Sequence, residues 1–181
     1  MRYRRARVAG ATYFFTLVTY RRQSLFGEAD AVDMFNRASQ SVRSRRAFTL
    51  EAQVILPDHL HAIWTLPDDD FDYATRWRLI KEAFTRAYAQ RHRLPARDAK
   101  RRARGEQTVW QRRYWEHLIR DERDFIAHVE YIHYNPVRHG LVSAPRDWRH
   151  STFSEWVARN AYDASWGSDE MPKLPAWAGH E

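Results

Sequence analysis

The sequence predicts an α+β fold in which helices pack on one face of an antiparallel β-sheet. Segments rich in β-branched and aromatic residues alternate with segments whose apolar residues recur every three or four positions. Two neighbouring strand segments, 48–56 and 59–66, each have one apolar face and one more polar face. The chain has 181 residues, of which 44% are hydrophobic and 14% aromatic, so it can bury the core of one domain and still carry an extension.

The first elements are a strand, a helix and a second strand. Residues 11–20 combine Thr, Val, Tyr and Phe and predict a strand. Residues 28–45 predict a helix, because apolar residues follow helical spacing at Val32, Phe35, Ala38 and Val42. Residues 48–56 alternate like a strand, and the side chains expected on its apolar face are Phe48, Leu50, Ala52, Val54 and Leu56.

Pro57-Asp58 breaks the chain before a third strand at 59–66. The side chains expected on one face of this strand are Leu60, Ala62, Trp64 and Leu66; those expected on the other are His59, His61, Ile63 and Thr65. We therefore expect a sheet with helices on one side and an open working surface on the other.

The later elements complete the order β-α-β-β-α-β-α. Residues 70–92 predict a helix, and the charged run 91–104 predicts a mobile loop. Residues 109–119 predict a fourth strand and residues 121–135 a third helix, with Asp121 as its N-cap. This order is that of a ferredoxin-like, or RRM-like, sandwich. The pattern loosens from about residue 143, and we expect a domain at 1–156 followed by a tail at 157–181.

The composition narrows the classes of partner and chemistry. A formal net charge of +7, from 30 Lys and Arg against 23 Asp and Glu, favours nucleic acid first and an anionic membrane surface second. The chain has no cysteine, which excludes disulfides, thiolate nucleophiles and cysteine-ligated metals. The sequence shows neither a signal peptide nor a membrane span, so we expect a cytoplasmic protein.

His59 and His61 are the first candidates for chemistry. Residues i and i+2 of a strand share a face, so both imidazoles should project from the more polar side of the sheet. Two neutral imidazoles on a rigid strand can hold a divalent cation. The alternative is that two histidines merely occupy a polar strand face.

The third helix carries the second candidates. Its predicted buried stripe consists of Phe125, Val129, Ile132 and Pro136. A neighbouring stripe holds His128, Tyr131 and Asn135, and Pro136 should end the helix near Asn135. The alternative is a tyrosine packed at a helix–sheet seam, with Asn135 as a C-terminal cap.

The two elements together predict a phosphotyrosine-forming site. A phenol, with a pKa of about 10, is a poor nucleophile at neutral pH unless a cation or base lies near it. A cation held by the histidines, with Asn135 as an oxygen ligand, would supply that charge. The chain has no cysteine and few carboxylates beside the two histidines, which favours a hard ion that prefers oxygen ligands, Mg²⁺ or Mn²⁺.

These residues resemble a known family. Pro57-Asp-His-Leu-His61 resembles the His-hydrophobic-His motif of HUH endonucleases. Tyr131-Ile-His-Tyr-Asn-Pro-Val-Arg-His-Gly-Leu-Val142 resembles the tyrosine helix of REP-associated tyrosine transposases, a branch of the single-tyrosine HUH transposases. The resemblance also covers Trp110-Gln-Arg-Arg-Tyr-Trp-Glu-His-Leu and extends over about residues 3–156.

The resemblance implies residue roles and a reaction. Tyr131 would be the nucleophile, with Tyr134 as its rival, and His59, His61 and Asn135 would bind the metal. The implied reaction is transesterification of single-stranded DNA at REP-type hairpins through a 5′-phosphotyrosine, without a nucleotide cofactor. The implied setting is the bacterial nucleoid, with no membrane partner and with the protein acting as a monomer or a homodimer.

Two arginine-rich groups are candidates for DNA contacts. The N-terminal group is Arg2, Arg4, Arg5 and Arg7; the second group is Arg97, Lys100, Arg101, Arg102 and Arg104. The alternative for each group is a merely solvated basic segment. Two competing functions remain open: a hairpin-binding protein that has lost cleavage, and a zinc-dependent hydrolase of a small molecule.

Overall fold

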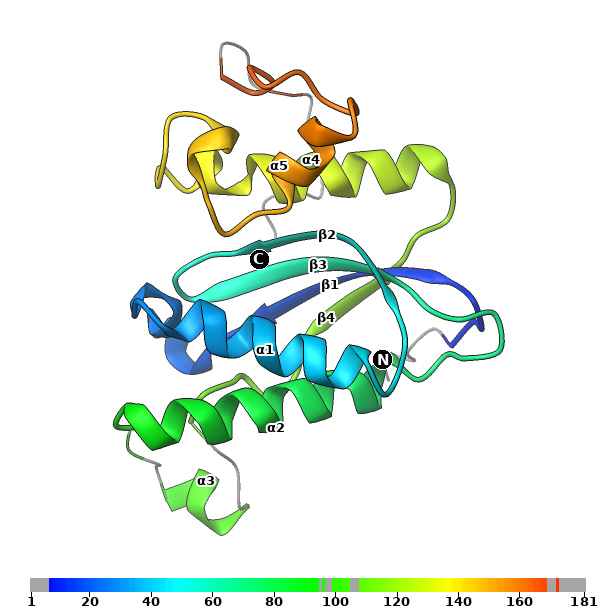
Figure 1. Ribbon diagram of the computed structural model, residues 1–181. Helices are drawn as coiled ribbons and strands as arrows, with labels where there is room; N and C mark the ends of the chain where they lie inside the picture. The colour runs from blue at the N-terminus through cyan, green and yellow to red at the C-terminus, as the bar shows by residue number, and fades with distance from the viewer. Residues whose placement is uncertain (1–6, 95, 97–98, 105–107, 169–171, 173–181) are drawn as a thin grey trace.

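The computed structural model describes residues 7–168 and 172, except residues 95, 97–98 and 105–107. A four-stranded sheet forms its centre, with strand order β2-β3-β1-β4 and antiparallel pairing throughout (Figure 1). The strands are β1 (Thr12–Val18), β2 (Thr49–Ile55), β3 (His59–Thr65) and β4 (Trp115–Leu118). β1 and β3 combine the β-branched and aromatic residues that fit a pleated, half-buried surface, β2 has β-branched residues and β4 begins with Trp115. The predicted α+β fold class is therefore confirmed.

Helices α1 (Ala31–Arg43) and α2 (Tyr73–Arg91) pack against one face of the sheet (Figure 1). The core between them is aromatic, and the rings of Trp64 on β3 and Trp77 on α2 stack with centroids 3.8 Å apart. The side chain of Asp72 caps α2 by accepting a hydrogen bond from the backbone N–H of Thr75. Both elements match the helices predicted from apolar spacing.

Helix α4 (Glu122–Arg138) lies across the opposite face, which we had expected to be open (Figure 1). Its Val129 and Ile132 pack on Phe14, Val54 and Ile63 of the sheet in a second core. The expectation was wrong because the apolar stripe of this helix needs an apolar partner, and α1 and α2 already cover the first face.

Helix α4 also continues past Pro136, so the predicted end at Asn135 was wrong. A proline inside a helix removes only one backbone donor, and here the helix is held on both sides by the sheet and by the following segment. The helix ends at Arg138, and Gly140, two residues later, has φ +66°. The N–H of Leu141 donates to the Pro136 carbonyl and that of Gly140 to the Val137 carbonyl, as in a Schellman motif.

A β-bulge splits the alternating pattern of β2. Leu50 pairs with Trp64 and Ala52 with Ile63, so Glu51 is an extra residue on this strand. Leu50 consequently packs with the α1–α2 core, whereas Ala52 packs under α4. The prediction that residues 48–56 present a single apolar face was therefore wrong, because one inserted residue turns every following side chain to the other face.

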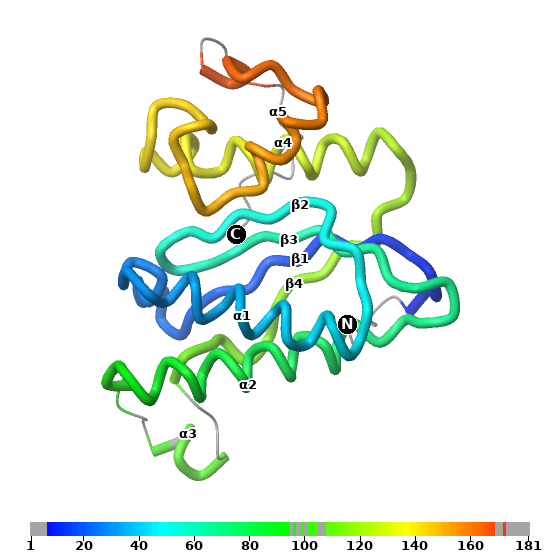
Figure 2. The backbone as a smooth tube through the Cα atoms, viewed as in Figure 1, coloured from blue at the N-terminus to red at the C-terminus, as the bar shows by residue number. Residues whose placement is uncertain are grey.

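The chain after α4 turns back along β2 (Figure 2). It contains the short helices η3 (Pro145–Asp147) and α5 (Phe153–Ala158). Indole N–H groups of Trp148 and Trp156 donate to the carbonyls of Ile55 and Glu51, at 3.0 and 2.9 Å. This segment thereby caps the edge of the sheet next to α4, and the boundary expected at residue 156 stays a prediction.

Three short elements lie outside the central layers. Residues Tyr20–Arg22 (η1) and Leu25–Gly27 (η2) link β1 to α1, and α3 (Ala99–Ala103) lies within the run 91–104, which we had expected to be a loop. The five residues of α3 include neither Gly nor Pro, the two residues that most disfavour a helix. None of the described helices has the length and hydropathy of a membrane span.

Candidate active site

The two histidines of β3 point toward α4 from neighbouring positions on one face of the sheet. Their ring centroids are 5.1 Å apart, and the side chains of His59 and His61 are 1% and 0% exposed. The alternation of side chains along a strand, which placed them together in the sequence, accounts for this arrangement.

Each of these imidazoles is oriented by a neighbour at its Nδ1 atom. Nδ1 of His59 lies 2.6 Å from Oδ1 of Asp58, and Nδ1 of His61 lies 2.9 Å from the hydroxyl of Thr16. Burial alone would raise the pKa of Asp58, but the hydrogen bond from His59 and the charge of Arg22 lower it overall. A hydrogen bond from Nδ1 to a carboxylate, as His59 has with Asp58, is the usual arrangement around a histidine that binds a metal through Nε2.

Tyr131 and Asn135 lie one helical turn apart on α4, and Tyr131 faces the histidine pair. The Tyr131 ring lies edge-on to His61, with centroids 5.2 Å apart, and the side chain is 2% exposed. Oδ1 of Asn135 and the Nε2 atoms of His59 and His61 are all buried. Two imidazole nitrogens and one carboxamide oxygen are atoms of the kind that could hold a divalent cation.

Arg138 is a site residue that the sequence analysis missed. Its Nη1 donates a hydrogen bond of 3.0 Å to the Tyr131 hydroxyl, and its guanidinium carbon lies 5.5 Å from the centroid of that ring. Arg138 follows Tyr131 by two helical turns and so shares its face. The spacing of seven residues between Tyr131 and Arg138 could have identified Arg138. The sequence analysis ended the helix at Asn135 and therefore did not place Arg138 on it.

Tyr134, the rival of Tyr131, points away from the histidines. Its ring lies edge-on to Trp166 in the C-terminal segment, with centroids 6.3 Å apart. His133 also faces that segment, where Nε2 lies 3.0 Å from the Thr152 hydroxyl. Burial lowers the pKa of His133 to about 3, so it is neutral near pH 7.

A second group of possible metal ligands lies farther along the same face of the sheet. Donor atoms of His117, Asp124 and His128 lie within 4.8 Å of one another. The imidazoles of His117 and His128 are stacked at 15°, however, so their in-plane lone pairs run side by side instead of converging on one ion. A hydrogen bond explains why these side chains lie together without a metal, because Asp124 Oδ2 lies 2.8 Å from Nε2 of His117. Glu116 of β4 is buried, and its side chain points to the α1–α2 side of the sheet, away from both groups of histidines.

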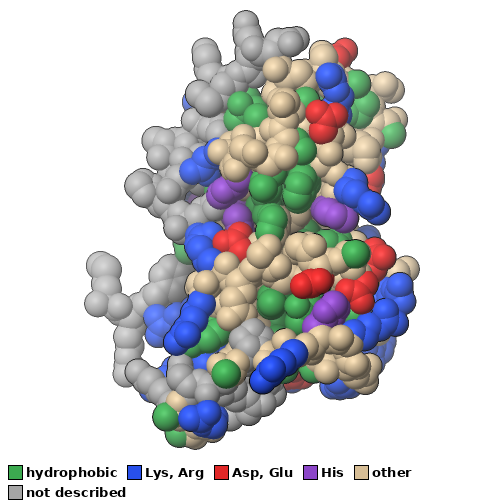
Figure 3. Space-filling view, turned by 90° about the vertical axis from the view of Figure 1, so that its left-hand side faces the viewer, with side chains coloured by type: hydrophobic (Ala, Val, Ile, Leu, Met, Phe, Trp, Pro, Cys, Tyr) green, Lys and Arg blue, Asp and Glu red, His purple; other side chains and the backbone are tan. Residues whose placement is uncertain are grey.

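The site opens at the end of the molecule where α4 finishes. Arg138 and His139 are exposed there, and the His139 ring lies 5.0 Å from that of His59. Arg22, 41% exposed, forms its ion pair with Asp58 at this end. Figure 3 views this end and shows histidine, basic and acidic side chains together at the seam between the two layers. An anionic substrate entering here would meet positive charge first.

The candidate DNA-contact residues are scattered. Arg7 lies beyond the far end of β3 from His59, with its guanidinium 6.0 Å from the Phe71 ring centroid. Arg101 stacks on Tyr20 at 3.7 Å. Arg102 and Arg104 are exposed. The remaining candidates lie outside the described residues, Lys100 by its side chain only: Arg2, Arg4, Arg5, Arg97 and Lys100.

Two proteins of known family are similar to this chain over most of its length. No family model matches the chain. A REP-associated tyrosine transposase of Escherichia coli (strain K12) is 40% identical over 167 residues, which cover 92% of this chain and 91% of the relative. A Haemophilus influenzae protein assigned to the same group is 38% identical over 172 residues, 95% of this chain and 96% of its own.

A solved structure agrees with the sequence comparison. The structure of a REP-associated tyrosine transposase bound to a REP hairpin superimposes with a TM-score of 0.76 at 37% identity, and covers 97% of each chain. The resemblance drawn from the His-Leu-His motif and the tyrosine helix is thereby confirmed. The chain belongs to the family of REP-associated tyrosine transposases.

Proposed function

We propose that this transposase nicks and rejoins single-stranded DNA at REP-type hairpins, with Tyr131 as the nucleophile. The observation that carries the proposal is the position of the Tyr131 ring, 5.2 Å from His61 and with Arg138 bound to its hydroxyl. The solved relative bound to a REP hairpin supports the choice of substrate.

The proposed reaction exchanges one phosphodiester bond for another. The Tyr131 oxygen forms a bond to the scissile phosphorus as the bond to the 3′ oxygen breaks. The phenol loses its proton and the departing 3′ oxygen gains one, which leaves a 5′-phosphotyrosine and a 3′ hydroxyl. Attack by a 3′ hydroxyl on this linkage reverses the step and joins strands, so no nucleotide cofactor is consumed.

His59, His61 and Asn135 are proposed to hold the divalent cation, Mg²⁺ or Mn²⁺. When bound, such an ion polarises the phosphate and stabilises the negative charge of the transition state. Asp58 and Thr16 orient the two imidazoles through their Nδ1 atoms. These contacts at Nδ1 leave Nε2 of each ring as the atom that would bind the cation.

Arg138 is proposed to stabilise negative charge on the Tyr131 oxygen. A hydrogen bond from a guanidinium is stronger than one from a neutral donor, and it favours a charged phenol oxygen during attack and departure. The planar fork of Arg138 can also contact the phosphate, since its side chain is exposed at the mouth of the site.

We propose that the protein acts as a monomer or a homodimer; the contacts of Tyr131 with His61 and Arg138 within one chain support the monomer. We further propose that residues 1–156 form the catalytic domain, that 157–181 form a tail, and that the protein acts on chromosomal DNA in the cytoplasm. Tyr162 and Trp166 of this tail stack with centroids 4.7 Å apart, and Tyr162 stacks on Phe153.

The test is a denaturing gel of labelled hairpin oligonucleotides incubated with protein and Mn²⁺ or EDTA. We expect a covalent protein–DNA band that requires Mn²⁺, is lost in Tyr131→Phe and persists in the matched control Tyr134→Phe. A band that persists in Tyr131→Phe would reject the nucleophile. Hairpin binding without any covalent band would favour a protein that binds hairpins and no longer cleaves them. Failure to bind DNA at all would favour hydrolysis of a small molecule.

A further inference from the structure

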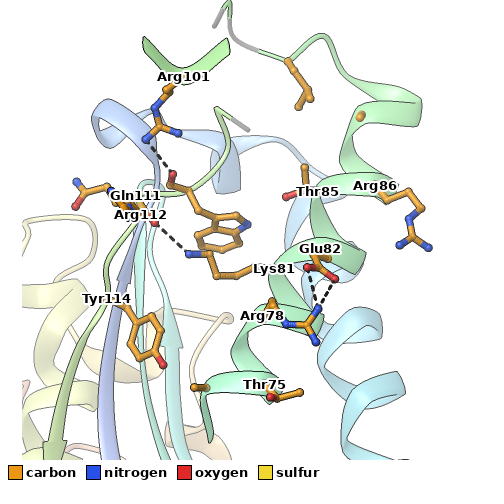
Figure 4. A pocket seen from close by; sticks show the side chains of 14 residues that line it. Thr75, Arg78, Lys81, Glu82, Thr85, Arg86, Arg101, Gln111, Arg112 and Tyr114 are labelled. Atoms are coloured by element: carbon orange, nitrogen blue, oxygen red, sulfur yellow. Dashed lines mark hydrogen bonds and ion pairs between the residues drawn. The ribbon is translucent and has the colours of Figure 1, made fainter. Parts of the chain in front are cut away.

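A groove of about 820 Å³ lies beside α2, on the side of the sheet away from α4 (Figure 4). One wall is the outer face of α2, and the other is formed by residues 110–112, Tyr114 and Arg101. The proposed chemistry at Tyr131 makes no use of this groove.

The groove is positively charged. Among the described residues that line it, one is acidic and five are basic: Arg78, Lys81, Arg86, Arg101 and Arg112. The acidic residue, Glu82, is already paired with Arg78 at 3.1 Å. Figure 4 shows basic side chains on both walls, and Lys81 of α2 reaches the opposite wall, where its ammonium donates to the Gln111 carbonyl at 3.1 Å. An occupant beside this contact would have positive charge on either side of it. This distribution suits a phosphate backbone.

The shape of the groove selects single-stranded nucleic acid. Its lining includes the apolar side chains of Ala74, Ala89 and Leu94 and the ring of Tyr114, together with the basic side chains. A flat base fits against apolar and aromatic side chains while its phosphate contacts basic ones. A duplex keeps its bases stacked inside and would present only its backbone, which leaves the apolar part of the groove unused.

The groove is also close to the candidate active site along the sheet. The N–H of Gln111, in the groove wall, donates to the Val18 carbonyl at 2.9 Å. Val18 pairs in turn with His59. Two strand spacings of about 4.8 Å separate Gln111 from His59, so the backbones are on the order of 10 Å apart. Because β4 is an edge strand, a DNA strand can pass around this edge from one face to the other.

We propose that the groove between α2 and residues 110–114 binds the single-stranded DNA that flanks the hairpin next to the cleaved phosphate. This inference rests on the proposed function, since it assumes that the chain acts on hairpin DNA. It adds a second binding surface for the same strand, on the opposite face of the sheet from Tyr131.

The test compares two probes by fluorescence anisotropy: a hairpin alone, and the same hairpin with a single-stranded extension on its 5′ or 3′ side. We expect the extension to tighten binding to the wild-type protein about tenfold. The double variant Arg86→Glu/Arg112→Glu should lose this gain and bind the bare hairpin as the wild type does. The salt dependence of log K for the extended probe should become shallower by about 1.4, for two lost single-strand contacts.

The matched control is Arg37→Glu/Arg149→Glu, which reverses two exposed charges outside the groove. It should keep the gain from the extension. Equal loss in the control, no loss in the groove variant, or equal loss for both probes would overturn the inference. Competition by free dAMP that removes only the gain would also overturn it, because it would assign the groove to a mononucleotide. A wild-type protein that binds the bare hairpin but gains nothing from either extension would overturn the inference alone, whereas one that binds no hairpin would reject the proposed function itself.

Discussion

Arg138→Met tests the assignment of Tyr131 without altering the nucleophile. The variant keeps an unbranched side chain on the exposed end of α4 and removes the 3.0 Å bond from Nη1 to the Tyr131 hydroxyl. A hydrogen bond from a charged donor contributes about 1.5–3 kcal/mol. Because Arg138 is exposed and solvent screens its charge, we expect the lower part of this range, about 1.5–2 kcal/mol. The rate of attack should then fall roughly 10- to 30-fold.

The assay is the single-turnover rate of covalent complex formation on a hairpin oligonucleotide with Mn²⁺. Arg138→Lys, which keeps the charge and loses the planar fork, should lie between the wild type and Arg138→Met. Arg123→Met is the matched control, because Arg123 is exposed on the first turn of the same helix. A wild-type rate for Arg138→Met would refute the role of Arg138. A loss of rate that is matched by the loss in hairpin affinity would show that Arg138 binds DNA without acting on Tyr131.

Three further results are expected. Asp58→Ala, which removes the carboxylate at Nδ1 of His59, should weaken Mn²⁺ binding about 10- to 100-fold in a titration of the protein without DNA; unchanged binding would contradict the assignment of the metal site. His133→Gln should flatten the pH dependence of the free energy of unfolding in urea, because burial lowers the pKa of His133 from 6.5 to about 3. Below pH 6.5 the unfolded chain binds a proton at this residue that the folded chain does not, so stability is lost as the pH falls toward 3, and an unchanged slope in His133→Gln would argue against this cause. Gly140→Ala should lower the free energy of unfolding by about 1–2 kcal/mol, because Gly140 has φ +66°, a conformation that an L-residue with a Cβ disfavours. Nothing lies within 4 Å of an added Cβ, so the loss would come from the backbone and not from a clash. A neutral result would mean that the helix end relaxes.

Side-chain periodicity explains why much of the fold could be predicted. The period of two in residues 59–66 places His59 and His61 on one face whatever the rest of the chain does. The helical period places Tyr131 and Asn135 one turn apart on α4 in the same way. Both are local properties of the backbone, so the sequence is sufficient to establish them.

The errors arose where long-range packing outweighs a local preference. Pro136 disfavours helix locally, yet α4 continues because the sheet and the segment after Gly140 hold it on both sides. The bulge at Glu51 leaves no mark in the alternation of residues 48–56, since a single extra residue preserves the pattern and reverses the face.

The sequence by itself determined the order of the elements, the shared face of the two histidines and the family resemblance. Only the tertiary structure decided that α4 covers the second face of the sheet, that Tyr131 and not Tyr134 lies against His61, and that Arg138 reaches the Tyr131 hydroxyl. The reason is physical: periodicity defines directions within one element, whereas the meeting of two elements depends on which apolar surfaces remain to be buried once the others have packed.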